Sequence, residues 1–162
     1  DFVMARKDLG FISGTRKPIL QLGTLSDDLM RRDFTVNAMA MDMDGNLIDQ
    51  WRGQSALMQM TLRTPLDPMT TLMDDPLRLL RALRFSITRG FRISDILWDA
   101  MMQPGILVKM KDVVSQDRMR DEVTKMMAHD TVKSLKLLSS IPGLLDVVFS
   151  DGLWLMPTSK KV

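Results

Sequence analysis

The clearest hydrophobic pattern of the chain lies between residues 74 and 90. Apolar residues recur there at helical spacing, and at about 100° per residue they fall within one stripe of roughly 100°. Two aspartates and a proline precede this stripe and a glycine follows it, as is typical of the two ends of a helix. We therefore predict a helix from about 74 to 89, capped by Asp74 or Asp75. Its buried side comprises Leu79, Leu80, Leu83 and Ile87.

The chain after this helix keeps a helical pattern. Ser or Asp residues precede three of the later apolar stretches, and Pro-Gly pairs end two of them, which favours several short helices. The predicted helices are one opened by Ser94 and Asp95 and ended by Pro104-Gly105, and then 116–128, 131–140 and 144–149.

The first 64 residues contain shorter and more polar elements. Asp44-Gly45 lies between two apolar pairs, which is a strong hairpin signal. Ser26 is predicted to cap a short helix, with Asp27 and Asp28 in its first turn. The predicted strands are 1–6, the segment after 38, 47–49 and 62–64; the helices are 25–30, 35–38 and 50–60; and the loops are 7–24, with an extended segment at 19–20, and 65–71.

Strands and helices are thus segregated along the sequence. This order predicts an α+β fold in which the strand-rich part comes first and an all-helical part follows. We divide the chain into a first domain at 1–71, a helical domain at 72–150 and a tail at 151–162.

Composition narrows the classes of protein. The 162 residues include no cysteine and one histidine, which excludes disulfides, thiolate metal sites and multi-histidine sites. The net charge of +2 does not indicate strong nonspecific binding of polyanions, so the distribution of charge matters more. Neither a secretory signal nor a long apolar run is present, and we expect a soluble cytoplasmic protein without a membrane partner.

Arginines accumulate on the polar side of the central helix. Residues 76–94 contain five arginines and no acid, although solvated helices usually mix the two signs. Either acids from elsewhere in the fold pair with these arginines, or the arginines form an anion site. In the second case, an aspartate followed three residues later by an arginine presents the acceptor and the donors that a nucleobase edge requires.

Two long segments resemble motifs of one enzyme family. Residues 25–40 (LSDDLMRRDFTVNAMA) resemble the DL-RRDFT-NA-A motif of class II tRNA nucleotidyltransferases, the CCA-adding enzymes, a motif that bacterial poly(A) polymerases share. Residues 74–85 (DDPLRLLRALRF) resemble the EDPLR-LRA-RFA motif of the same family, and 114–122 is similar to its S-ER---E helix. Two long motifs in the family's order form a far more specific signal than one short pattern.

The resemblance implies a fold and an activity. The fold would be a partial polymerase-β-like nucleotidyltransferase head followed by a helical neck. The activity would be template-independent addition of CMP and AMP to the 3′ end of tRNA, with CTP and ATP as substrates and Mg²⁺ as cofactor. Arginines and metal ions are the expected means of neutralising a triphosphate during such a transfer.

Specific residues follow from the resemblance. Asp75 and Arg78 correspond to the pair that selects the incoming base, which would reject U and G by leaving polar groups unpaired. The other nucleotide-binding residues that the resemblance implies are Arg32, Asp33, Asn37, Arg81 and Arg84.

The chain also departs from the family pattern. The family's Gly-Gly loop and Asp-x-Asp metal motif would precede the first residue, so we expect an incomplete polypeptide that is inactive alone. A separate polypeptide is one source of the missing motif. Asp1 corresponds to the family's third acidic residue, and it is either the one remaining metal ligand or an ordinary acid at a strand end. Gln50 and Ala56 replace a usual Pro and Asp.

Two alternatives remain open from the sequence. A poly(A) polymerase shares the same motifs, so CCA, CC, A and poly(A) addition are not separated. A non-catalytic remnant that binds RNA or a nucleotide would keep the arginine face without the metal motif.

Overall fold

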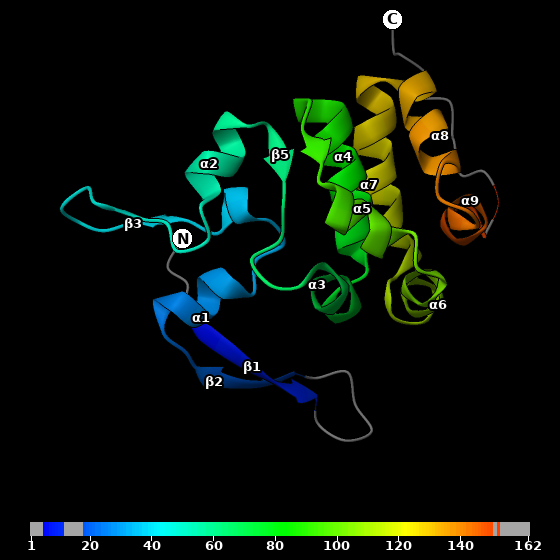
Figure 1. Cartoon of the computed structure of the whole chain (residues 1–162). Coiled ribbons are helices and arrows are strands. Elements are labelled where there is room, and N and C mark those ends of the chain that lie inside the picture. The colour runs from blue at the N-terminus through cyan, green and yellow to red at the C-terminus, as the bar shows by residue number, and fades with distance from the viewer. Residues whose placement is uncertain (1–4, 12–17, 151, 153–162) are drawn as a thin grey trace, which may run out of the picture.

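A computed structural model of the chain describes residues 5–11, 18–150 and 152, and side chains from residue 22 onward and at Ala5 (Figure 1). The strands in this part are β1 (Arg6–Phe11), β2 (Pro18–Leu22), β3 (Ala40–Met41), β4 (Leu47–Ile48), β5 (Thr61–Leu62) and β6 (Arg92–Ile93). The helices are α1 (Leu25–Met30), the 3₁₀ turn η1 (Thr35–Asn37), α2 (Gly53–Met58), α3 (Pro68–Asp74), α4 (Leu77–Arg89), α5 (Asp95–Met101), α6 (Pro104–Val113), α7 (Gln116–His129), α8 (Thr131–Ser139) and α9 (Leu144–Val148).

The first hairpin corrects the predicted loop at 7–24. β1 and β2 pair antiparallel, with Arg6 opposite Leu22 and Lys7 opposite Gln21. The extended segment predicted at 19–20 belongs to β2, but residues 7–11 form a strand rather than a loop. Residues 7–11 form a strand because β2 supplies their hydrogen-bond partners. The pattern of polar and apolar residues within 7–11 does not reveal this pairing. Of the strand predicted at 1–6, residues 1–4 lie outside the described residues.

Helix α1 has the predicted bounds but a different cap. Thr24, not Ser26, is the N-cap residue: its hydroxyl accepts from the Asp27 N–H at 3.2 Å, and the Asp27 carboxylate accepts from the Thr24 N–H at 2.8 Å. This reciprocal pair is a capping box. Ser26 instead donates to the Gln50 side chain at 2.8 Å.

The predicted hairpin is confirmed, and the helices predicted at 35–38 and 50–60 are present over the shorter ranges Thr35–Asn37 and Gly53–Met58. η1 leads into β3, and β3 pairs antiparallel with β4 through a turn in which Gly45 has a φ of 84°. α2 follows, where the Asp49 carboxylate accepts from the Gly53 N–H at 2.6 Å.

The junction before the central helix differs from the prediction. The loop predicted at 65–71 is wrong from residue 68, because Asp67 caps α3 and Pro68 is its first residue. Asp74 ends α3 rather than capping α4, and Asp75 is an extended break between the two helices. α4 therefore begins at Leu77 and ends at Arg89. Gly90 follows it, and its φ of 74° is the left-handed conformation that favours glycine.

The apolar side of α4 is the centre of the core. Leu79, Leu80 and Leu83 are fully buried, as predicted. α7 lies beside α4 (Figure 1) and contributes Met119 and Val123 to the same cluster. Burying such side chains is the main favourable term in folding, about 1.5–3 kcal/mol each.

Two elements of the helical part are missing from the prediction. Pro104-Gly105 does not end the preceding helix as predicted: α5 already ends at Met101, and Pro104 is the first residue of α6. The other element is β6, which pairs in parallel with β5, Thr61 opposite Arg92. The strand predicted at 62–64 is thus present at Thr61–Leu62, but its partner lies beyond α4.

The α+β fold class is confirmed. The division at residue 71 and the tail at 151–162 stay predictions. Within the described residues, no helix is long and apolar enough to span a membrane.

Candidate nucleotide-binding site

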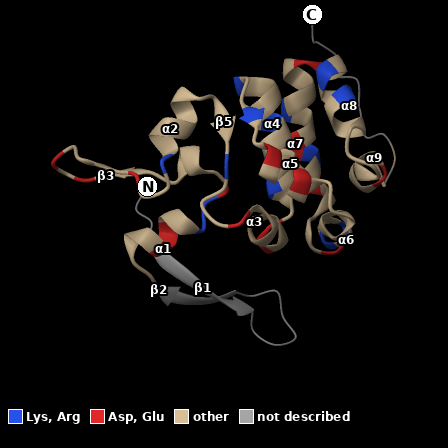
Figure 2. Cartoon of the chain, viewed as in Figure 1, with Lys and Arg blue, Asp and Glu red and all other residues tan. Residues whose placement is uncertain are grey.

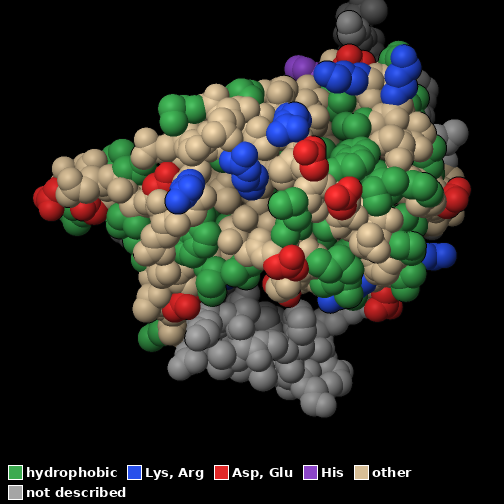
Figure 3. Space-filling model, in the orientation of Figure 1, with side chains coloured by type: hydrophobic (Ala, Val, Ile, Leu, Met, Phe, Trp, Pro, Cys, Tyr) green, Lys and Arg blue, Asp and Glu red, His purple; other side chains and the backbone are tan. Residues whose placement is uncertain are grey.

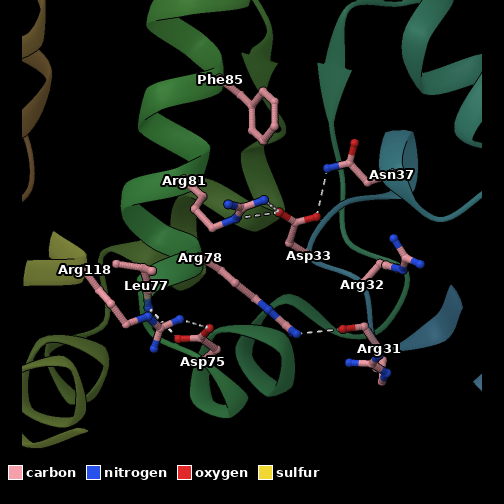
Figure 4. Close-up of a pocket in the computed structure, with 10 residues that line it drawn as sticks. All are labelled: Arg31, Arg32, Asp33, Asn37, Asp75, Leu77, Arg78, Arg81, Phe85 and Arg118. Atoms are coloured by element: carbon pink, nitrogen blue, oxygen red, sulfur yellow. Dashed lines mark hydrogen bonds and ion pairs between the residues drawn. The ribbon is translucent and has the colours of Figure 1, made fainter. Parts of the chain in front are cut away.

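A cavity of about 590 Å³ lies between the segment after α1 and the N-terminal half of α4 (Figure 4). Acidic positions occur in α1 and basic positions in the segment that follows it (Figure 2). The cavity is lined by five arginines, two aspartates and three other residues: Arg31, Arg32, Arg78, Arg81, Arg118, Asp33, Asp75, Asn37, Leu77 and Phe85.

The buried Asp33 and the partly exposed Arg81 form an ion pair across the cavity. Nε and Nη2 of Arg81 donate to Oδ2 of Asp33 at 2.8 and 2.7 Å, and Nη1 lies 3.4 Å from Glu122. The other Asp33 oxygen accepts from the Phe34 N–H and from Asn37. Burial lowers the pKa of Arg81, but attraction and hydrogen bonding to Asp33 and Glu122 raise it above its ordinary value, so Arg81 stays charged.

Arg84 lies outside the cavity lining. Its Nε donates to Glu122, which is 4% exposed, and its guanidinium lies over the Phe85 ring, 4.6 Å from the centroid. For Arg81 and Arg84 the structure thus favours pairing with distant acids over a free anion site, the first of the two sequence alternatives.

Asp28 holds the two arginines that follow α1. Its oxygens accept from Arg31 at 2.6 Å and from Arg32 at 2.9 Å. Burial raises the pKa of Asp28, but the hydrogen bonds from Arg32 and Arg31 outweigh burial and hold the pKa below its ordinary value. Asp28 therefore fixes both guanidiniums, whereas Asp27 lies in the first turn, as predicted, and completes the capping box with Thr24.

Arg78 differs from the other cavity arginines. Its Nη1 donates to the Thr71 carbonyl at 3.1 Å and its Nη2 to the Arg31 carbonyl at 2.6 Å. These neutral carbonyl groups fix the guanidinium between α3 and the segment after α1 without cancelling its charge. Of the five cavity arginines, Arg78 is the one that pairs with no carboxylate of the described residues.

Asp75 lies three residues before Arg78, and its carboxylate is bound by α4 and α7. Its Oδ1 accepts from the Leu77 N–H at 3.2 Å and its Oδ2 from Arg118 of α7 at 2.9 Å. Asp75 and Arg78 thus line the same cavity (Figure 4), with carboxylate lone pairs beside guanidinium donors. This combination can bind a group with donors and acceptors on one edge, as a nucleobase has.

The described residues do not fit a magnesium site. No group of three acidic or histidine side chains lies close enough to hold a metal ion in this part of the chain. Asp33 and Asp75 are instead engaged by arginines and backbone N–H groups. Asp1 lies outside the described residues.

The structure brings together most of the residues implied by the resemblance. Six of the seven line the cavity, all except Arg84: Arg32, Asp33, Asn37, Asp75, Arg78 and Arg81. Their functional roles stay predictions. Sequence reasoning missed Arg31 and Arg118 in the lining and Glu122 behind it. All three lie within the quoted motif segments, which is the signal that could have found them.

The first part of the chain matches a family model. Residues 4–63 match the Poly A polymerase head domain. Among curated relatives, a tRNA nucleotidyltransferase of Schizosaccharomyces pombe is 33% identical over 86% of this chain and 29% of its own length. The CCA-adding enzyme of Bacillus pumilus is 33% identical over 79% of this chain and 33% of its own.

Solved structures of such enzymes resemble most of the chain. The CCA-adding enzyme of Bacillus stearothermophilus in complex with CTP has a TM-score of 0.76 and 28% identity, over 90% of this chain and 34% of that one. The Thermotoga maritima CCA-adding enzyme complexed with tRNA has a TM-score of 0.69 at 28% identity, over 78% of this chain and 31% of that one. The chain resembles class II tRNA nucleotidyltransferases in its fold and motifs, and it matches the Poly A polymerase head-domain family over residues 4–63. It spans about a third of the length of these relatives.

Proposed function

We propose that this chain binds the incoming nucleotide and selects its base during addition of C and A to the 3′ end of tRNA. The carrying observation is the placement of Asp75 and Arg78, because both line one cavity and Arg78 keeps an uncompensated charge. The relatives support the proposal, since structures related to this chain contain CTP or an ATP analogue with a primer tRNA.

The cavity offers polar groups for both the base and the triphosphate of a nucleotide. The base edge would lie against Asp75 and Arg78. The triphosphate would lie toward Arg32, whose side chain is 49% exposed and has one carboxylate contact. Arg81 already forms ion pairs with Asp33 and Glu122. In this proposal it therefore positions Asp33 and does not bind phosphate.

The transfer step itself is not assigned to the described residues. It needs Mg²⁺, and their carboxylates do not fit a metal site. In the proposal, the metal ligands come from another part of the same protein or from a separate polypeptide. Poly(A) addition is the second candidate, because the matching head-domain family bears that name.

Titration of the chain with each nucleoside triphosphate, followed by NMR, tests the proposal. We expect CTP and ATP to bind with dissociation constants on the order of 0.1–1 mM, and UTP and GTP to bind more weakly. Binding of ATP alone would favour poly(A) addition. Equal binding of all four would contradict base selection.

A further inference from the structure

A second group of arginines lies outside the cavity, on the face formed by α2 and the β5–β6 pair. Arg52, Arg63 and Arg92 are all exposed, and we refer to them as the arginine row. On this face, Lys and Arg side chains are spaced over α2, β5 and β6 with no acidic side chain between them (Figure 3).

Strand pairing sets the spacing of two members of the row. Arg92 lies opposite Thr61 in the parallel pair, and Arg63 is two residues beyond Thr61, directly after the end of β5. Because side chains alternate with a period of two, Arg63 and Arg92 point to the same face. Strands about 4.8 Å apart with a rise of about 3.3 Å per residue place the two Cα atoms about 8 Å apart.

Arg52 is fastened to the same place through Thr35. The Thr35 N–H donates to the Arg63 carbonyl at 2.8 Å. A Cβ on Gly53 would lie 2.3 Å from the Thr35 carbonyl oxygen, so α2 approaches this point closely. Arg52 precedes Gly53 and has a φ of 56°, a left-handed conformation that favours glycine. The chain thus keeps a cation at a strained position, a feature that clusters at functional sites.

The charges of the row are weakly compensated. Arg63 donates to the neutral Gln59 side chain at 2.8 Å, and neither Arg52 nor Arg63 forms an ion pair with a described residue. Arg92 lies 3.4 Å from Asp95, but both side chains are largely exposed, and such pairs contribute little.

The row continues from the wall of the cavity. Phe85 lines the cavity and packs edge-on against Phe91, which directly precedes Arg92. Asn37 lines the cavity as well, and it belongs to the η1 turn whose Thr35 bonds Arg63. The wall of the cavity and the row are therefore joined through these two contacts.

We propose that the arginine row binds the phosphate backbone of the single-stranded RNA whose 3′ end enters the cavity. A guanidinium presents a planar fork of donors that matches phosphate oxygens, and grooves for single strands follow the backbone with such charges. The assignment rests on the proposed function for the identity of the RNA, whereas the row and the nucleotide cavity have separate residues and separate tests.

The experiment compares two double variants of the full chain. Arg63→Gln with Arg92→Gln removes two charges from the row. Lys133→Gln with Lys136→Gln removes two exposed charges from α8 and is the matched control. Binding of a labelled single-stranded RNA ending in CC is measured over a range of salt concentrations, and CTP binding is followed by NMR.

We expect the row variant to bind RNA more weakly and its slope of log K against log salt to flatten by about 1.4, which is 0.7 for each of two contacts. The control should retain the wild-type slope, and CTP binding should persist in both variants. Equal losses in both variants, no loss in the row variant, or no RNA binding by the wild type would overturn the proposal. Equally strong, row-dependent binding of a polyglutamate peptide would also overturn it.

The two proposals fail separately. Loss of CTP selectivity with a row-dependent RNA slope would reject the nucleotide site alone. Selective CTP binding with RNA binding indifferent to the row would reject the row alone.

Discussion

At the scale of single residues, partners decide what each arginine of α4 can do. Arg78 donates to two carbonyls and keeps its charge, whereas Arg81 is bound between Asp33 and Glu122. The sequence shows both at helical spacing and does not distinguish them. The difference arises from residues 41 to 48 positions away, which only the fold brings near.

Replacing Arg81 should destabilise the fold. Arg81→Ala leaves Asp33 and Glu122 without their shared cation, and both are more than nine-tenths buried. We expect a loss of about 2 kcal/mol, less than the 3–5 kcal/mol of a fully buried pair because Arg81 is partly exposed. Urea unfolding measures it. Lys125→Ala breaks an exposed pair with Asp121 and should cost less than about 0.5 kcal/mol; equal losses in the two variants would contradict the account.

Asp28 should make the stability of the fold depend on pH in the acid range. Its folded pKa is below the ordinary value of 3.8, so its contribution is complete above about pH 5 and disappears as pH falls through the folded pKa. Asp28→Asn should lower stability at neutral pH and reduce this acid-sensitive part. Thermal unfolding of both proteins across the acid range tests the expectation. An Asn variant with an unchanged acid profile would show that Asp28 does not contribute.

At the scale of elements, the sequence correctly predicted the helices whose position depends on their own residues. The apolar stripe of α4, its end at Gly90 and the bounds of α1 follow from the residues within each helix. The misses concern prolines that open helices, Pro68 and Pro104, and strands defined by a distant partner. β6 is two residues long and exists because β5 pairs with it, so no local pattern predicts it.

The start of α2 offers a test of backbone strain. Arg52→Gly relieves a left-handed conformation that costs about 1–2 kcal/mol, against roughly 0.5–1 kcal/mol for the greater freedom of glycine in the unfolded chain. We expect a net gain of about 0.5 kcal/mol in the free energy of unfolding. Gly53→Ala is the counterpart, because its Cβ would meet the Thr35 carbonyl, and it should destabilise. A loss of stability in Arg52→Gly would contradict the claim that the backbone is strained at Arg52.

At the scale of the whole molecule, the two predicted domains share one core. Phe34, from the first part, is fully buried and packs edge-on against Phe85 of α4, with ring centroids 5.7 Å apart. β5 and β6 join the same two parts through hydrogen bonds. The resemblance of motifs predicted most of the cavity lining. Arg31, Arg118 and Glu122 were not assigned from the sequence, because they act through contacts with residues far away in the chain.

Shared packing should make unfolding cooperative. Phe34→Ala removes a buried ring and should cost about 3–4 kcal/mol. Because the core is continuous, both parts should still unfold in one transition, as seen by circular dichroism and by NMR signals from α2 and α8. Two separate transitions would show that the division at residue 71 marks independent folding units.

The most direct test of the central claim is the affinity of the chain for CTP when Arg78 is replaced. Arg78→Ala removes the uncompensated charge and should weaken CTP binding by about tenfold or more, since charge-assisted bonds are worth about 1.5–3 kcal/mol. Arg89→Ala, at the exposed end of the same helix, is the matched control and should bind CTP like the wild type. Unchanged CTP affinity in Arg78→Ala, or an equal loss in Arg89→Ala, would contradict a nucleotide site built on Asp75 and Arg78.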